Sequence, residues 1–296
     1  MINYEVWHDE YKGDENLNVY WHGLYFVPED QKPQIISDLQ AIRDEHKISY
    51  EQDFKFASSL QKPKNCRVIE NHLLLFVHSL IVKEREAQTD IRNRDDGKKH
   101  KKDFTSFLNL SGLYGCKFIL FKIPDNHEAL KNEEQSYANR VETTFRHALR
   151  SGLHFLCSED VQISKFYFDG HEHHGRNIDL NRIIKGEMRD HVHLAEDLSI
   201  DDTQMSDRDV DTKMIIGLVD NIIGGLTASL NNVDDPNSAL YPLSEIIDRE
   251  NKGTLNLNIN GRWYKSISMF EMNISNNEKT FGPISSIGED SQPSLF

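Results

Sequence analysis

The sequence predicts an α/β fold of the α+β kind, in which a mixed β-sheet is flanked by helices. Short segments with alternating apolar and polar residues, a pattern typical of strands, recur along the chain. Between them lie longer segments whose apolar residues return at helical spacing. With 296 residues, the chain is long enough for one large hydrophobic core. We therefore expect one large domain that carries a smaller appendage.

The first part of the chain predicts a strand pair followed by two helices and a third strand. Residues 2–11 alternate in their first half, and residues 17–28 are rich in aromatic and β-branched side chains, so both segments are predicted strands that pair antiparallel. Apolar residues at helical spacing predict helices over 28–46 and 65–82. Residues 51–58 alternate again and predict another strand or extended edge.

The rest of the chain continues to alternate between the two element types. The predicted strands are 116–123 and 161–169, and the predicted helices are 133–157, 177–198 and 214–226, with a loop over 201–211 before the last. The C-terminal extension, residues 231–296, is expected to hold a short helix, a β-hairpin or small sheet and a polar tail that begins at 275.

The composition excludes several classes of protein. The chain is 38% hydrophobic with a mean hydropathy of -0.61, and it has no apolar run of about 18 residues, so no membrane span is expected. No secretion signal is visible, which predicts a cytoplasmic protein. The cysteines Cys66, Cys116 and Cys157 are odd in number and far apart, a pattern that excludes a disulfide framework.

The charge limits how the protein could meet a polyanion. Its formal net charge is -14, whereas non-specific nucleic-acid binding depends on Lys and Arg displacing counterions. Divalent cations, a partner subunit or a local basic patch would have to supply positive charge. The densest basic cluster, residues 98–102, lies in a charged stretch that is equally well explained as a solvated loop.

Three aspartates stand where acids are poorly explained by packing. Asp9 follows the alternating part of the first strand, Asp169 ends a later strand, and Asp220 lies in the apolar segment 214–226. Three carboxylates that meet would repel one another unless divalent cations lie between them, and hard oxygen ligands favour Mg²⁺ or Mn²⁺. The alternative is structural: solvated acids beside a hairpin, and Asp220 as a capping or salt-bridge residue.

This arrangement resembles the ribonuclease H-like superfamily, in which a first-strand Asp, a later-strand Asp and an acid on a closing helix hold two metal ions. It is similar, more narrowly, to the prokaryotic domain family of unknown function numbered 3800, with its opening Asp-Glu-Ser-Gly motif, middle Glu-x-Lys segment and closing Leu-Gln-x-Ala-Asp helix. The corresponding segments here are Asp9-Glu10-Tyr11-Lys12-Gly13, Asp53-Phe54-Lys55 and Gly217-Leu218-Val219-Asp220. The resemblance covers residues 2–230. Tyr11-Lys12 replaces the opening Ser, and Gly217 replaces the closing Gln.

The resemblance implies a ribonuclease H-like domain over 1–230 and a metal-dependent nuclease that hydrolyses DNA or RNA by a two-metal mechanism. Asp9, Asp169 and Asp220 would hold Mg²⁺ or Mn²⁺, Lys55 would balance charge on the phosphate, and Glu10 would be a further catalytic acid. His171 could relay protons, although the segment His171-Glu172-His173-His174 could instead bind zinc or be a polar loop.

The resemblance also implies partners. It makes a role in antiviral defence plausible. A protein partner such as an ATPase belongs to the alternative function below, and homo-oligomers are allowed. The alternative function is a catalytically idle ribonuclease H-like scaffold that acts as a binding or regulatory subunit of a larger complex.

Overall fold

The fold is taken from a computed structural model of the chain. The structure describes residues 2–12, 19–52, 54–56, 63–79, 115–124, 161–168, 184, 192–230, 256–259, 262–265, 267–275 and 278–283. The helix predicted over 133–157, the short helix expected in the C-terminal extension, at 243–250, and the basic cluster at 98–102 lie outside these ranges.

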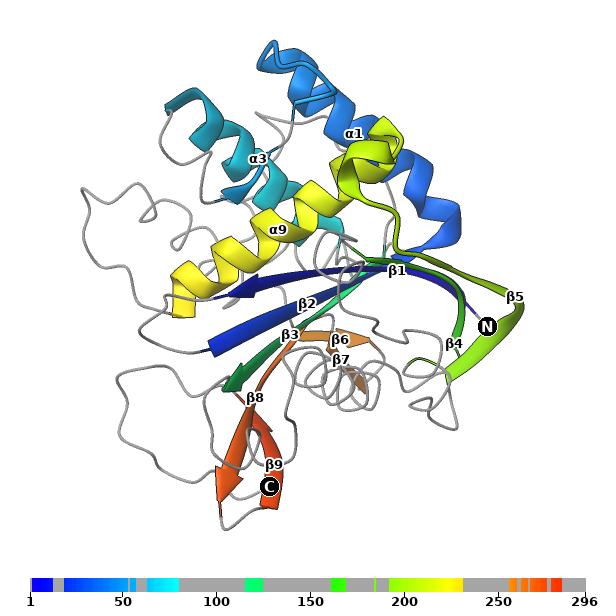
Figure 1. Ribbon diagram of the computed structural model, residues 1–296, viewed down its shortest axis with the longest axis vertical. Helices are drawn as coiled ribbons and strands as arrows, with labels where there is room; N and C mark the ends of the chain where they lie inside the picture. The colour runs from blue at the N-terminus through cyan, green and yellow to red at the C-terminus, as the bar shows by residue number, and fades with distance from the viewer. Residues whose placement is uncertain are drawn as a thin grey trace.

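A seven-stranded mixed sheet runs through the molecule in the order β5-β4-β1-β2-β3-β8-β9 (Figure 1). β1 pairs antiparallel with β2 and parallel with β4, so it has a partner on each side. β2–β3 and β8–β9 are antiparallel, whereas β4–β5 and β3–β8 are parallel. The strands are β1 (Ile2–Lys12), β2 (Val19–Pro28), β3 (Lys117–Pro124), β4 (Val161–Phe168), β5 (Val192–Asp201), β8 (Ile267–Ser275) and β9 (Glu278–Pro283). β6 (Asn256–Ile259) and β7 (Arg262–Lys265) form a separate antiparallel pair.

The long helices of the described structure, α1, α3 and α9, lie on the same side of this sheet (Figure 1). Their bounds are Lys32–Glu45 (α1), Pro63–Ser79 (α3) and Val210–Leu230 (α9), with single 3-10 turns at Glu29–Gln31 (η1) and Met205–Asp207 (η2). None of the described helices has both the length and the apolarity needed to span a bilayer. A sheet with helices packed on it confirms the α/β class predicted from the sequence.

Each face of the sheet has its own hydrophobic cluster, and β1 contributes to both. Trp7 packs with residues of α1, α3 and α9, whereas Val6 belongs to the cluster on the opposite face. Successive side chains of a strand point to opposite faces. The odd-numbered residue Asp9 therefore lies on the helix side with Trp7, and the even-numbered His8 and Glu10 lie on the other side.

The close approach of α9 to the sheet depends on a glycine in β2. Gly23 is paired with Asp9 of β1. A Cβ atom added at Gly23 would come within 2.6 Å of Ile223 Cγ1 and 2.9 Å of Phe118 Cζ, so with any larger residue these side chains, or α9 itself, would have to shift. Among the strands, α9 packs chiefly on β1 and β2, the strand that carries Asp9 and the strand that carries Gly23.

The prediction of a strand over 51–58 is wrong for those of its residues that the structure describes. Residues 51–52 form a turn and 54–55 have no regular structure. The main-chain groups of this segment bind side chains of α1 and α9 instead of a neighbouring strand. The alternation of Phe54 and Phe56 therefore reflects packing against helices and not sheet formation.

Two further predictions are wrong at their ends. Residues 192–198, expected to end a helix over 177–198, form the first part of β5, which pairs with β4 over 192–194 and, after an irregularity, over 199–201. The tail expected from Ser275 contains β9, which pairs with β8 and extends the main sheet. The division of the chain at residue 230 stays a prediction.

Candidate functional site

Asp9 is a buried carboxylate on the helix-covered face of β1. Its residue is 7% exposed. Asp9 Oδ1 accepts a hydrogen bond of 2.8 Å from the backbone N–H of Glu10, which fixes one carboxylate oxygen. Because its partner in β2 is Gly23, the space beside Asp9 is filled by α9 and not by a cross-strand side chain.

Asp220 lies on α9, one turn before the residue that touches Gly23. It is half-buried, and its Oδ2 accepts a hydrogen bond of 2.5 Å from the backbone N–H of Phe56. Ile223, three residues later on the same helix face, packs on Gly23, the β2 partner of Asp9. The structure thus brings Asp9 and Asp220 to the same face of the sheet, on two elements that pack against each other.

The end of β4 lies beside the part of β1 that carries Asp9. β4 runs parallel to β1, and its last residue, Phe168, is paired with His8. One position earlier, Trp7 and Tyr167 stack on the helix side with ring centroids 3.7 Å apart and planes 5° from parallel. Asp169, the next residue of the sequence, lies outside the described residues, and so does His171.

Lys55 belongs to a short segment that α9 holds by its main chain. The carbonyl of Phe54 accepts a hydrogen bond of 3.4 Å from Asn221 Nδ2, and the N–H of Phe56 donates to Asp220. The side chain of Lys55, between these two anchors, is exposed. Lys55, the basic residue that the sequence singled out, therefore directly precedes Phe56, whose backbone N–H binds Asp220.

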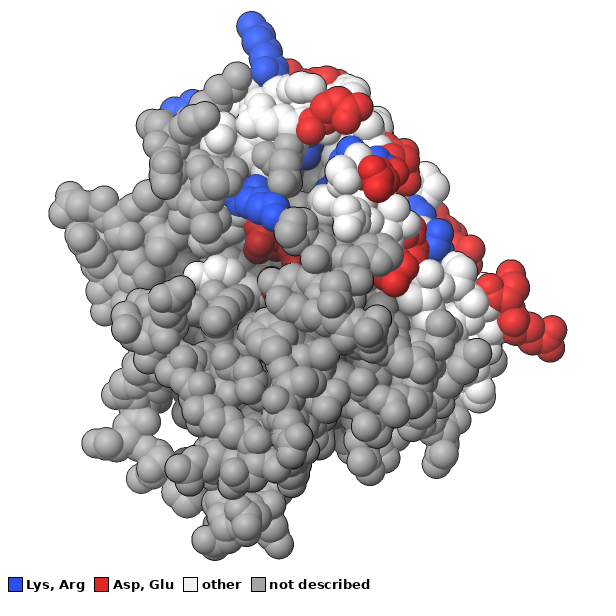
Figure 2. Space-filling view, viewed as in Figure 1, with Lys and Arg blue, Asp and Glu red and all other residues white. Residues whose placement is uncertain are grey.

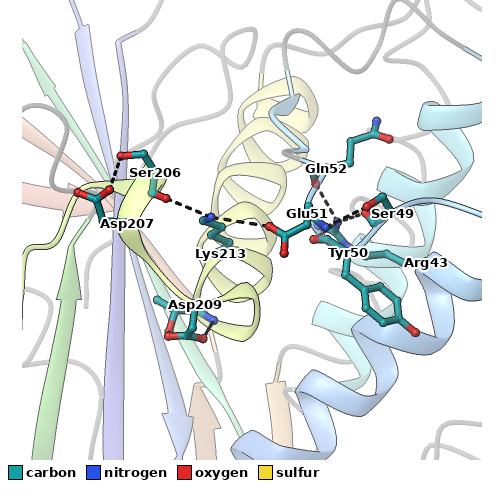
Figure 3. Close-up of polar contacts among 10 residues, drawn as sticks. Arg43, Ser49, Tyr50, Glu51, Gln52, Ser206, Asp207, Asp209 and Lys213 are labelled. Carbon is teal, nitrogen blue, oxygen red and sulfur yellow. Dashed lines mark hydrogen bonds and ion pairs between the residues drawn. The ribbon is translucent and has the colours of Figure 1, made fainter.

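Arg43 of α1 orders the turn that leads into this segment (Figure 3). Its guanidinium is buried and donates to the carbonyls of Ser49, Tyr50 and Gln52 at 2.9, 2.9 and 2.7 Å. It also lies 5.2 Å from the centre of the Phe54 ring, a cation–π distance. Figure 3 shows Lys213 of α9 on the other side of the turn, between Glu51 and Ser206. Side chains of α1 and α9 thus both hold the turn at residues 49–52, which leads to the segment that binds Asp220.

Arg208 joins the end of β4 to the start of α9. This buried side chain donates from Nη2 to the carbonyl of Phe168 and from Nε to the carbonyl of Thr203 at 2.7 Å. Its Nη2 lies 3.3 Å from the carbonyl oxygen of Asp201 at the end of β5. The peptide that precedes Asp169 is therefore anchored by the segment that leads into α9.

A neutral histidine supports α9 behind the acid. Asn221 Nδ2 lies 2.9 Å from His72 Nδ1, so we assign an unprotonated Nδ1 that accepts this hydrogen bond. Burial lowers the pKa of His72 to about 3, and the nearby charges of Arg43 and His46 act in the same direction. A proton on His72 would be both unsolvated and opposed by the donor of Asn221.

The pKa of His72 predicts a loss of stability in mild acid. Since its folded-state pKa lies below the unfolded value near 6.5, the unfolded chain binds the extra proton between pH 6.5 and about 3, and stability falls as the pH drops through this range. The loss is about 2 kcal/mol by pH 5. Burial raises the pKa of Asp38 to about 6, so this residue opposes the loss below pH 6.

Urea unfolding at pH 7, 6 and 5 tests this prediction. His72→Asn, which keeps an acceptor near the position of Nδ1, should lose less stability than the parent chain on acidification. Asp38→Asn removes the opposing group and should lose more. Equal pH profiles for His72→Asn and the parent chain would contradict the assignment.

The structure also forms a cluster that the sequence reasoning missed. His8, Glu10 and His22 lie on the face of β1 and β2 opposite to the helices, with one potential ligand atom from each within 4.8 Å of the others. The sequence singled out Glu10 as a further catalytic acid, and the structure places it on the face of the sheet opposite to Asp9, as the alternation of a regular strand predicts. The strand register, Glu10 opposite His22, is the signal that could have found the cluster.

No protein-family model, curated protein or solved structure matches the chain. A function for the chain is therefore inferred from its own side chains alone.

In the view of Figure 2, acidic side chains gather along the side where α1 and β5 lie, with basic groups between them.

Proposed function

We propose that the chain is a metal-dependent nuclease with a ribonuclease H-like domain, in which Asp9, Asp169 and Asp220 hold Mg²⁺ or Mn²⁺. The observation that carries the proposal is the contact of α9 with β1 and β2 at Gly23, which brings Asp220 to the face of the sheet where Asp9 is buried. The parallel neighbour of β1 ends at the same level, directly before Asp169. A first-strand acid, a later-strand acid and a closing-helix acid are the elements that the resemblance requires.

The donor set suits a hard divalent cation. Carboxylate oxygens are the ligands that Mg²⁺ and Mn²⁺ prefer, and positive charge reduces the repulsion between carboxylates on neighbouring elements. When bound, such ions polarise water and stabilise negative charge on a phosphodiester.

The described residues around the acids have defined tasks in this proposal. The N–H groups of Glu10 and Phe56 each hold one carboxylate oxygen of Asp9 and Asp220, which limits the rotation of both side chains. The exposed Lys55 supplies a cation beside Asp220 for the substrate phosphate. An acidic chain of this kind relies on such local charge, and on the metal, to accept a polyanion.

The test is cleavage and stability measured with and without metal. The full chain is incubated with single- and double-stranded DNA and RNA in Mg²⁺, in Mn²⁺ and in excess chelator, and thermal unfolding is recorded under the same conditions. We expect metal-dependent cleavage of at least one substrate and a stabilisation of several degrees by either ion. If the chain shows no cleavage and no thermal shift with metal, the idle scaffold is favoured instead. The partners of that scaffold, an ATPase among them, stay a prediction.

A further inference from the structure

We propose that His8, Glu10 and His22 form a second metal site, for a zinc-like cation, on the face of the sheet opposite to Asp9 and Asp220. This inference goes beyond the proposed nuclease function and does not depend on it. It concerns other side chains, another face of the sheet and another class of metal.

The antiparallel pairing of β1 and β2 brings the three side chains together. Glu10 and His22 are directly opposite each other, and His8 lies two residues before Glu10, so all three point to the same face. His8 Nε2 lies 3.1 Å from His22 Nδ1, and His22 Nδ1 lies 3.7 Å from Glu10 Oε2. The two imidazole rings lie nearly parallel, 24° apart.

These separations fit the coordination shell of zinc. Zn–N and Zn–O bonds are about 2.0–2.2 Å long, so neighbouring ligand atoms of a tetrahedral site lie roughly 3.3–3.5 Å apart. The observed 3.1 and 3.7 Å fall on either side of that value. A cation could therefore be held between the three atoms after small rotations of the side chains.

The donor set distinguishes this site from the aspartate site. Two imidazole nitrogens and one carboxylate oxygen are a set that zinc uses when its fourth position holds a water or another ligand. Carboxylate oxygens alone favour Mg²⁺ or Mn²⁺. The chain would thus carry two sites that prefer different metal ions, one on each face of the sheet at β1.

The surroundings strengthen the case for a cation. His8 is 1% and His22 is 0% exposed, and the side chain of Glu10 is 9% exposed. The ring of Phe168 lies 5.3 Å from that of His8 and forms part of an apolar wall. In such surroundings the field of a carboxylate is weakly screened, and a divalent ion would supply positive charge directly to Glu10. The metal-free alternative is a hydrogen-bonded cluster in which His8 and His22 share one proton.

The test is zinc binding to the full chain after treatment with a chelator. Zn²⁺ is titrated against a chromogenic zinc indicator, and Co²⁺ is used as a spectroscopic probe because tetrahedral Co²⁺ absorbs visible light strongly. We expect one site that disappears from the titration in His22→Gln and weakens by at least about tenfold in Glu10→Gln. Glu10→Gln keeps the size and shape of the side chain and only removes its charge, so it answers the question even if His22→Gln does not fold.

Two matched controls separate this site from the others. Asp9→Asn combined with Asp220→Asn removes two acids of the proposed nuclease site and should leave zinc binding unchanged, so failure of one proposal does not decide the other. His173→Gln combined with His174→Gln removes the other histidine-rich segment and should also have no effect. Zinc binding that survives Glu10→Gln and His22→Gln, or is absent from the parent chain at micromolar Zn²⁺, would overturn the proposal.

Discussion

Replacing Asp220 with asparagine is expected to lower metal-dependent cleavage by at least about a thousandfold, which corresponds to about 4 kcal/mol of transition-state stabilisation. The substitution removes a negative charge that would hold the metal. It leaves a carboxamide oxygen that can still accept the hydrogen bond from the backbone N–H of Phe56. We therefore expect the variant to fold normally, with a free energy of unfolding close to that of the parent chain in the absence of metal.

The comparison is made with initial rates in Mg²⁺ and Mn²⁺ and with urea unfolding. Asp9→Asn should behave like Asp220→Asn, and the double variant should lose little more activity than either single one, because all three disable the same site. Asp211→Asn is the matched control, since it changes the same residue type on the same helix, where Asp211 Oδ1 accepts a hydrogen bond from Gln40 of α1. Activity of Asp220→Asn within threefold of the control would remove Asp220 from the site.

The elements that local sequence determines were predictable. β1 to β4 each show alternation or a run of β-branched and aromatic residues, and α9 shows a long apolar segment. The position of Asp9 under α9 was not predictable in this way, because it depends on Gly23 having no side chain where Ile223 packs. The sequence contains that glycine, but a single chain does not indicate which helix meets it.

The features that sequence reasoning missed are produced by contacts between distant segments. Residues 51–56 alternate in sequence like a strand, yet Arg43 and Asp220 bind main-chain groups of Gln52 and Phe56, and the described residues 51–52 and 54–55 form a turn and a short irregular segment. The cluster of His8, Glu10 and His22 forms only in the observed register of β1 and β2. A slip of one residue would turn the side chains of one strand to the opposite face of the sheet and separate the three.

Replacing Arg208 with alanine is expected to cost about 3 kcal/mol in the free energy of unfolding and to weaken metal binding at the aspartate site. The buried guanidinium donates to the carbonyls of Phe168 and Thr203, and the deletion leaves these oxygens without the charged donor in a place poor in water. The same deletion frees the end of β4 directly before Asp169. A higher Mg²⁺ concentration should therefore be needed for half-maximal thermal stabilisation.

Arg208→Lys and Arg67→Ala make this prediction specific. Lysine keeps the positive charge but cannot donate from several nitrogens of a planar group at once, so it should recover only part of the stability and of the metal response. Arg67 is an exposed residue of α3, and its replacement by alanine should change the free energy of unfolding by less than about 0.5 kcal/mol. Arg208→Ala could instead lower stability without changing the Mg²⁺ concentration needed for half-maximal thermal stabilisation. Arg208 would then support only the fold, and metal binding at the end of β4 would not depend on it.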